Sequence, residues 1–339
     1  MTRNSSAHDP SSAATAQSAK RKRLPVWRRL LKVAAIGVAS VLALLLISIA
    51  ANAMLTRSEK SDLVPYGTKV SIAAGDLNVY RNGGTGPTIV LLSGWGTAAP
   101  AVDFAPLIRE LDAFNVIVIE GFGYGYSDLG VTDRTVENIS AEIHEVLAKL
   151  GVDSPVILAG HSIGGLYTHY YANAYPGEVA AIIGIDPMTA QTSSLEVSDA
   201  STVFGTLADL GLVRVANALA PALVQPNGTA FTTDERKRIV AMTDWTSGNA
   251  AVSDEWARMA ANSTKAAALP IPAGIPVLEM LATDTINTNT HWLPDHKAEL
   301  AEVTVHELDI IEGTHYLHWT QAPLMGRTIA AFLAAHLSH

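Results

Sequence analysis

The sequence predicts an α/β protein in which helices cover both faces of a mostly parallel, doubly wound sheet, preceded by an N-terminal transmembrane helix. Two observations predict this class. Short runs of β-branched residues and leucine, such as 88–92 and 115–119, alternate with helical patterns such as 101–111 and 135–150. A stretch of 24 residues without an ionisable side chain, 33–56, is long enough to cross a membrane.

The N-terminal region predicts a single-pass anchor. Residues 1–32 are rich in Ser and Ala and then basic, and we expect them to form a disordered cytoplasmic tail. At 1.5 Å per residue, 33–56 covers about 36 Å, against a hydrocarbon core of roughly 30 Å. The basic flank favours a cytoplasmic N-terminus, so the domain beyond the linker 57–67 is expected to be extracytoplasmic.

A cleaved secretory signal is the alternative to an uncleaved anchor. The small residues Ala51-Asn52-Ala53 fit the pattern that a signal peptidase accepts. The apolar core of a signal peptide has about 7 to 15 residues. Because the uncharged run here is longer, an uncleaved anchor is favoured.

Charge also separates the two parts of the chain. Residues 1–57 hold 9 Lys/Arg and 1 Asp, whereas the remainder holds 14 Lys/Arg and 31 Asp/Glu, a net charge of −17. An acidic domain repels phosphate backbones, so no nucleic-acid partner is expected. The chain has no cysteine, which excludes disulfides, thiol nucleophiles and a cysteine-bound zinc site.

The strongest chemical signal is the segment Gly160-His161-Ser162-Ile163-Gly164. It follows a predicted strand, 155–159, and precedes a helical pattern, 166–174. In a G-x-S-x-G turn between a strand and a helix, the glycines allow tight packing around a strained serine, whose hydroxyl is exposed. The pattern therefore predicts a nucleophile elbow at Ser162.

Polar and glycine-rich loops follow other predicted strands. Backbone N–H groups of Ser93-Gly94-Trp95-Gly96, after the strand 88–92, are expected to point at a substrate oxygen. The glycines of 121–125 do not have the G-x-G-x-x-G spacing and do not open a helix, so no dinucleotide cofactor is expected. Two carboxylates, Asp186 and Asp284, end further strands, where such sheets bind ligands.

The order of strand, Ser93–Gly96 loop, helix, strand, Gly-rich aromatic loop, helix, strand and Gly-His-Ser-Ile-Gly-Gly elbow resembles the α/β-hydrolase superfamily. The resemblance covers about residues 70–336. It implies an α/β-hydrolase core, 68–187 and 273–339, with a helical cap inserted at 188–272. It also implies that the catalytic base is His315, in the motif Gly313-Thr314-His315.

The acid that orients His315 stays open between two residues. The commonest family arrangement takes the acid from the strand after the cap, which selects Asp284, but a turn-like polar segment, 285–290, follows that residue. Asp186 resembles the acid of a subset of relatives that use the earlier strand. Pro187 restricts the backbone where the chain leaves that strand. We favour Asp186.

The chemistry that the resemblance implies is acyl transfer to water from a small or lipid-like ester or amide, with Ser162 as the nucleophile. Serine argues against the dehalogenase and epoxide-hydrolase relatives, which use aspartate. The N–H groups of Trp95 and Ile163 are expected to hold the oxyanion. The residues expected to contact substrate are Gly94, Tyr124, His161 and His318.

No cofactor is expected, and no metal, because no third ligand falls near His315 and His318. A different functional class is a non-catalytic binding or sensing module on the same fold, which would need a broken triad. The sequence leaves the substrate and the oligomeric state open.

Overall fold

The computed structural model describes residues 25–337 apart from 131, 190–199, 222–225 and 227–228. The chain divides into two compact units, Met1–Ile47 and Ser48–His339. The whole sheet belongs to the second unit.

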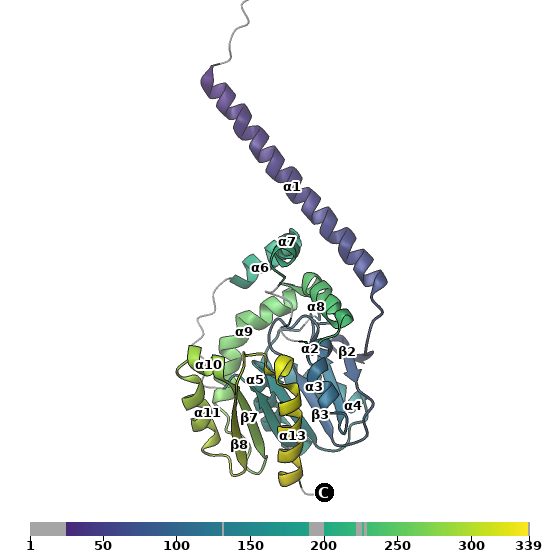
Figure 1. Cartoon of the computed structure of the whole chain (residues 1–339), viewed down its shortest axis with the longest axis vertical. Helices are drawn as coiled ribbons and strands as arrows, with labels where there is room; N and C mark the ends of the chain where they lie inside the picture. The colour runs from purple at the N-terminus through teal and green to yellow at the C-terminus, as the bar shows by residue number, and fades with distance from the viewer. Residues whose placement is uncertain (1–24, 131, 190–199, 222–225, 227–228, 338–339) are drawn as a thin grey trace, which may run out of the picture. The chain divides into compact units, whose positions relative to one another are not determined.

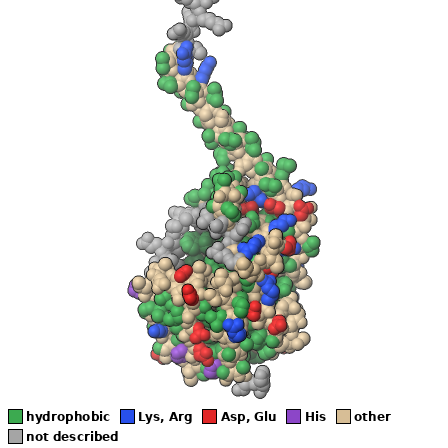
Figure 2. All heavy atoms as spheres, viewed as in Figure 1, with side chains coloured by type: hydrophobic (Ala, Val, Ile, Leu, Met, Phe, Trp, Pro, Cys, Tyr) green, Lys and Arg blue, Asp and Glu red, His purple; other side chains and the backbone are tan. Residues whose placement is uncertain are grey.

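Helix α1 spans Val26–Asp62 and buries none of its residues. Among the described residues it is the one helix long and apolar enough to cross a membrane. Figure 2 shows mostly hydrophobic and uncharged side chains along it, with basic ones near its N-terminal end. The helix extends beyond 33–56 at both ends, so parts of the expected tail and linker are helical. The reason is local, because residues 26–32 and 57–64, on either side of the uncharged stretch, contain no Gly or Pro.

Eight strands form one sheet in the order β1-β2-β4-β3-β5-β6-β7-β8. The pairs β1–β2 and β2–β4 are antiparallel, and every other neighbouring pair is parallel. The strands are β1 Thr68–Ile72, β2 Gly75–Arg81, β3 Thr88–Leu92, β4 Asn115–Glu120, β5 Val156–His161, β6 Val179–Ile185, β7 Val277–Ala282 and β8 His306–Ile311. The predicted α/β-hydrolase fold is confirmed.

The alternation of side chains along β3 shows why the sheet carries two cores. Ile89 and Leu91 pack on one face, where helices α3 Ala105–Glu110 and α13 Ala322–His336 lie (Figure 1). Val90 and Leu92 pack on the other face with α4 Val136–Lys149 and α5 Gly164–Ala174. Because successive side chains of a strand point to opposite faces, a strand buried on both faces must be apolar throughout.

Between β6 and β7, the described residues include several helices, which lie beyond one end of the sheet (Figure 1). Its helices are α6 Ala200–Asp209, α7 Leu212–Leu219, α8 Thr233–Thr246 and α9 Ala250–Ala267. Helix α9 packs against α4, α5 and α6 and falls inside the helical cap that the resemblance implies at 188–272. Its bounds were not assigned from the sequence, because its many alanines give little apolar contrast. We call these four helices the cap.

Two local predictions need correction. The helical pattern 101–111 is two helices, α2 Pro100–Asp103 and α3, separated at Phe104. The expected turn after Asp284 is part of a helix, α10 Thr283–Thr288, because backbone and side-chain contacts to the loop after β8 hold its start. The remaining helices are α11 Trp292–Leu300, α12 Leu317–Thr320 and the 3-10 turn η1 Pro176–Glu178.

Candidate active site

Ser162 lies in a strained turn between β5 and α5. Its φ is 54°, in the left-handed region that residues with a Cβ atom seldom adopt. A Cβ atom on Gly160 would stand 2.4 Å from the carbonyl oxygen of Gly164, so only glycine allows this close approach. The carbonyl of Ser162 accepts hydrogen bonds from the N–H groups of Gly165 and Met188, at 2.9 and 2.7 Å. The turn thus has the geometry of a nucleophile elbow.

Asp186 lies directly after β6 and is fully buried. Its Oδ2 is 2.6 Å from Nδ1 of His315, whose side chain is 33% exposed. Oδ1 accepts from the Ala282 N–H at 3.0 Å and from Trp292 Nε1 at 2.9 Å, and the Thr285 hydroxyl donates to Oδ2. Both carboxylate oxygens are therefore engaged, so the direction of the imidazole is set from the core.

Asp284 has a different environment. It is exposed at the start of α10, and its backbone N–H donates to the carbonyl of Gly313 at 3.1 Å. The geometry therefore pairs His315 with Asp186, while Asp284 contacts the histidine loop through a backbone hydrogen bond.

Contacts of neighbouring residues link the serine turn to the segments that hold this pair. The N–H of Ser162 donates to the carbonyl of Ile185, the residue before Asp186, at 3.3 Å. On the other side, Nε2 of His161 lies 3.1 Å from the carbonyl of His315. Ser162, Asp186 and His315 thus lie in the segments that follow the carboxyl ends of β5, β6 and β8.

The loop after β3 lies against the elbow because β3 and β5 are neighbours in the sheet. A Cβ atom on Gly94 would stand 3.1 Å from Cβ of Ser162 and 2.9 Å from Nδ1 of His161, so the backbone here is in close contact with the serine turn. In the described part of the chain, neither the N–H of Trp95 nor the N–H of Ile163 donates a hydrogen bond.

The comparisons with known proteins agree with this architecture. A family model described as the alpha/beta hydrolase fold matches residues 87–265, more than half of the chain. The chain belongs to the α/β-hydrolase family.

Individual relatives extend the likeness of this α/β hydrolase along the chain. The uncharacterized protein YbdG of Bacillus subtilis (strain 168) is 29% identical over 310 residues, 87% of this chain and 94% of that protein. Lipase 1 of Psychrobacter immobilis is 28% identical over 120 residues, which cover 34% of this chain and 37% of the lipase. The crystal structure of carboxylesterase CesB from Bacillus subtilis covers 85% of this chain and 99% of its own, with a TM-score of 0.57 at 16% identity, a likeness in fold.

His161, next to the serine, is buried in the hydrolase core. Since a carbonyl only accepts, its Nε2 carries the proton and donates to His315, which leaves Nδ1 as the unprotonated nitrogen. Burial lowers the pKa of His161 well below its usual range, and the nearby His318 and His315 lower it further. His161 is therefore a neutral buried group that supports the His315 loop.

His318 is fully buried and paired. Its Nε2 lies 2.6 Å from Oδ2 of Asp103, and Trp319 Nε1 donates to the other oxygen at 2.8 Å. The sequence predicts that His318 contacts substrate. It does not indicate Asp103, which carries no motif and lies 215 positions from the histidine along the chain.

Tyr124 is buried as well, with its hydroxyl between the loop after β3 and the cap. Its partner Glu255, in helix α9, is not among the predicted site residues, because it carries no sequence motif. Among the described residues, no group of three or more His, Asp or Glu side chains is arranged to hold a metal ion.

Proposed function

We propose that this α/β hydrolase is a membrane-anchored, extracytoplasmic serine hydrolase that cleaves a small or lipid-like ester or amide. The observation that carries the proposal is the 2.6 Å contact between His315 Nδ1 and Asp186 Oδ2, beside a serine held at φ 54°. A binding module has no need of a strained serine and an oriented histidine in the same place.

In this mechanism, Oγ of Ser162 attacks the substrate carbonyl carbon while Nε2 of His315 takes the hydroxyl proton. The carbonyl electrons move to oxygen, and the N–H groups of Trp95 and Ile163 stabilise the oxyanion. Collapse breaks the bond to the alcohol or amine, which leaves with the proton from His315. Water then attacks the acyl-serine by the same route, and Asp186 stabilises the positive charge on the imidazole in both steps.

A fluorophosphonate probe tests the proposal directly, because it phosphonylates an activated serine. Full-length protein in its membrane or in detergent should be labelled, and peptide mass spectrometry should place the adduct on Ser162. Heat-denatured protein is the control and should not react. Native protein that stays unlabelled and cleaves no p-nitrophenyl ester would favour a non-catalytic binding module instead.

Replacing His315 and His318, one at a time, should separate catalysis from stability. We expect His315→Ala to lower kcat by several orders of magnitude with little change in Tm, because its side chain is partly exposed. His318→Ala leaves the buried Asp103 carboxylate with one partner fewer, which costs roughly 2 to 3 kcal/mol of stability. Kinetics and thermal unfolding of both variants check this, and equal losses of kcat would leave the base unassigned.

The anchor is tested by fractionation. Full-length protein should stay in the membrane pellet after carbonate washing, because the uncharged stretch of α1 has apolar side chains exposed along its length. Added protease should reach the hydrolase domain from the extracytoplasmic side alone, as the basic residues before the helix favour. A soluble product that begins near Met54 would show cleavage after Ala53 instead.

A further inference from the structure

The loop Ser93–Gly96, which we call the oxyanion loop, is tied to cap helix α9. Nε1 of Trp95 donates to the carbonyl of Val252 at 2.8 Å. The indole of Trp95 also contacts that of Trp256, one turn further along α9, with ring centroids 4.5 Å apart. The residue whose N–H faces the substrate oxygen in the proposed function is therefore held by the cap through its side chain.

A second connection runs through Tyr124. Its hydroxyl accepts a hydrogen bond from the N–H of Gly96 at 3.1 Å and donates its proton to Oε2 of Glu255 at 2.6 Å. Because a phenol has one proton, the bond to Glu255 fixes the hydroxyl as the acceptor for Gly96. Burial, followed by the charge of Glu255, raises the pKa of Tyr124 well above its usual range, so it stays protonated at neutral pH.

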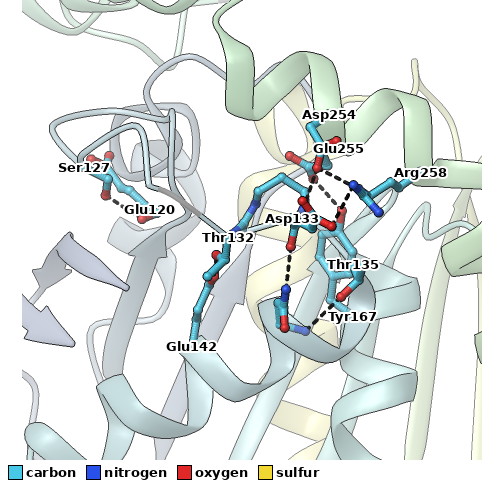
Figure 3. A network of polar contacts seen from close by, with 12 residues as sticks. Glu120, Ser127, Thr132, Asp133, Thr135, Glu142, Tyr167, Asp254, Glu255 and Arg258 are labelled. Carbon is cyan, nitrogen blue, oxygen red and sulfur yellow. Dashed lines mark hydrogen bonds and ion pairs between the residues drawn. The ribbon is translucent and has the colours of Figure 1, made fainter. Parts of the chain in front are cut away.

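Glu255 is anchored in turn from the core of the domain. Its Oε1 accepts from the Tyr167 hydroxyl on α5, a contact that Figure 3 shows from close by. Arg134, paired with Glu142 at 2.7 Å, offsets part of the cost of burying the Glu255 charge. A buried carboxylate is costly unless directional bonds satisfy it, and here those bonds orient the side chain toward Tyr124.

We propose that Tyr124 and Glu255 are positioning residues through which cap helix α9 holds the oxyanion loop in place, an inference that rests on the proposed function. Gly96 has φ 74°, and no atom lies within 4 Å of where its Cβ would stand, so no side chain of its own holds it in place. Within the loop, the N–H of Thr97 donates to the carbonyl of Gly94 at 3.4 Å, and the bond from the Gly96 N–H to Tyr124 fixes the peptide that directly follows Trp95. Loss of one oxyanion donor typically costs about 10² to 10³ in rate, so a displaced loop should slow acylation.

The test compares two buried tyrosines that each donate one hydrogen bond to a glutamate: Tyr124 to Glu255, beside the oxyanion loop, and Tyr171 on α5 to Glu178, outside this network. In full-length protein, Tyr124→Phe should lower kcat roughly 10- to 100-fold with KM within about twofold. Tyr171→Phe, the matched control, should keep kcat within about twofold. A trifluoromethyl ketone, whose hemiketal oxygen occupies the oxyanion position, should bind Tyr124→Phe more weakly by the factor lost in kcat/KM.

Equal losses of kcat in the two variants, or wild-type kcat in Tyr124→Phe, would overturn the proposal. If Tyr124→Phe fails to fold, Trp95→Phe removes the bond to Val252 while keeping an aromatic ring, and it should also lower kcat. Failure of the proposed function is distinguishable, because the wild-type protein would then hydrolyse no ester, or Ser162→Ala would retain its activity.

Discussion

Ser162→Ala should abolish ester hydrolysis, lowering kcat by about 10⁴-fold or more, since removal of a serine nucleophile leaves only substrate binding and the oxyanion donors. The fold should persist, because the hydrogen bonds around the turn involve the backbone of Ser162, and its side chain is partly exposed. The measurements are steady-state kinetics with p-nitrophenyl esters and thermal unfolding.

A matched control is Ser140→Ala, which removes a buried hydroxyl on α4 that has no hydrogen-bond partner among the described residues. We expect Ser140→Ala to keep wild-type kcat. Retention of most activity by a folded Ser162→Ala protein would contradict the assignment of the nucleophile.

The second large effect is expected at Asp186. Asn at this position keeps the size of the side chain but offers an NH₂ group on one side. Because Ala282 and Trp292 donate to one oxygen, the NH₂ group would face His315 and favour the tautomer whose Nε2 carries the proton. That tautomer accepts no proton from serine, so kcat should fall about 10⁴-fold, the loss that the same change causes in a serine protease.

Asp284→Asn is the matched control, since Asp284 contacts the histidine loop through its backbone N–H. Its kcat should remain within about twofold of wild type. If Asp284→Asn were the crippling change and Asp186→Asn stayed near wild type, the acid would have to be reassigned.

The features that the sequence predicts best are those set by neighbours along the chain. The apolar run of β3 is buried on both faces, as its composition requires. Thr135 caps α4 and accepts from the N–H of Asn138. The glycines around Ser162 are where close backbone contacts require them. In each case the physical cause lies within a few residues of its effect.

Contacts between segments far apart in the chain were harder to predict from the sequence. The pairs His318–Asp103 and Tyr124–Glu255 join residues 215 and 131 positions apart, and neither pair carries a local pattern. From the sequence alone, a polar side chain is expected at the surface, because the distant partner that allows its burial cannot be identified along the chain.

By itself, the sequence determined the fold class, the strained serine turn and the long apolar helix, since strand and helix periodicity, glycine spacing and the absence of charge are local properties. The tertiary structure decided which carboxylate meets His315 and which cap residues meet the oxyanion loop. Asp186 and Asp284 both follow buried strands and look alike along the chain. Only the path of the loop after β8, across the ends of neighbouring strands β6 and β7, brings Nδ1 of His315 to one of them.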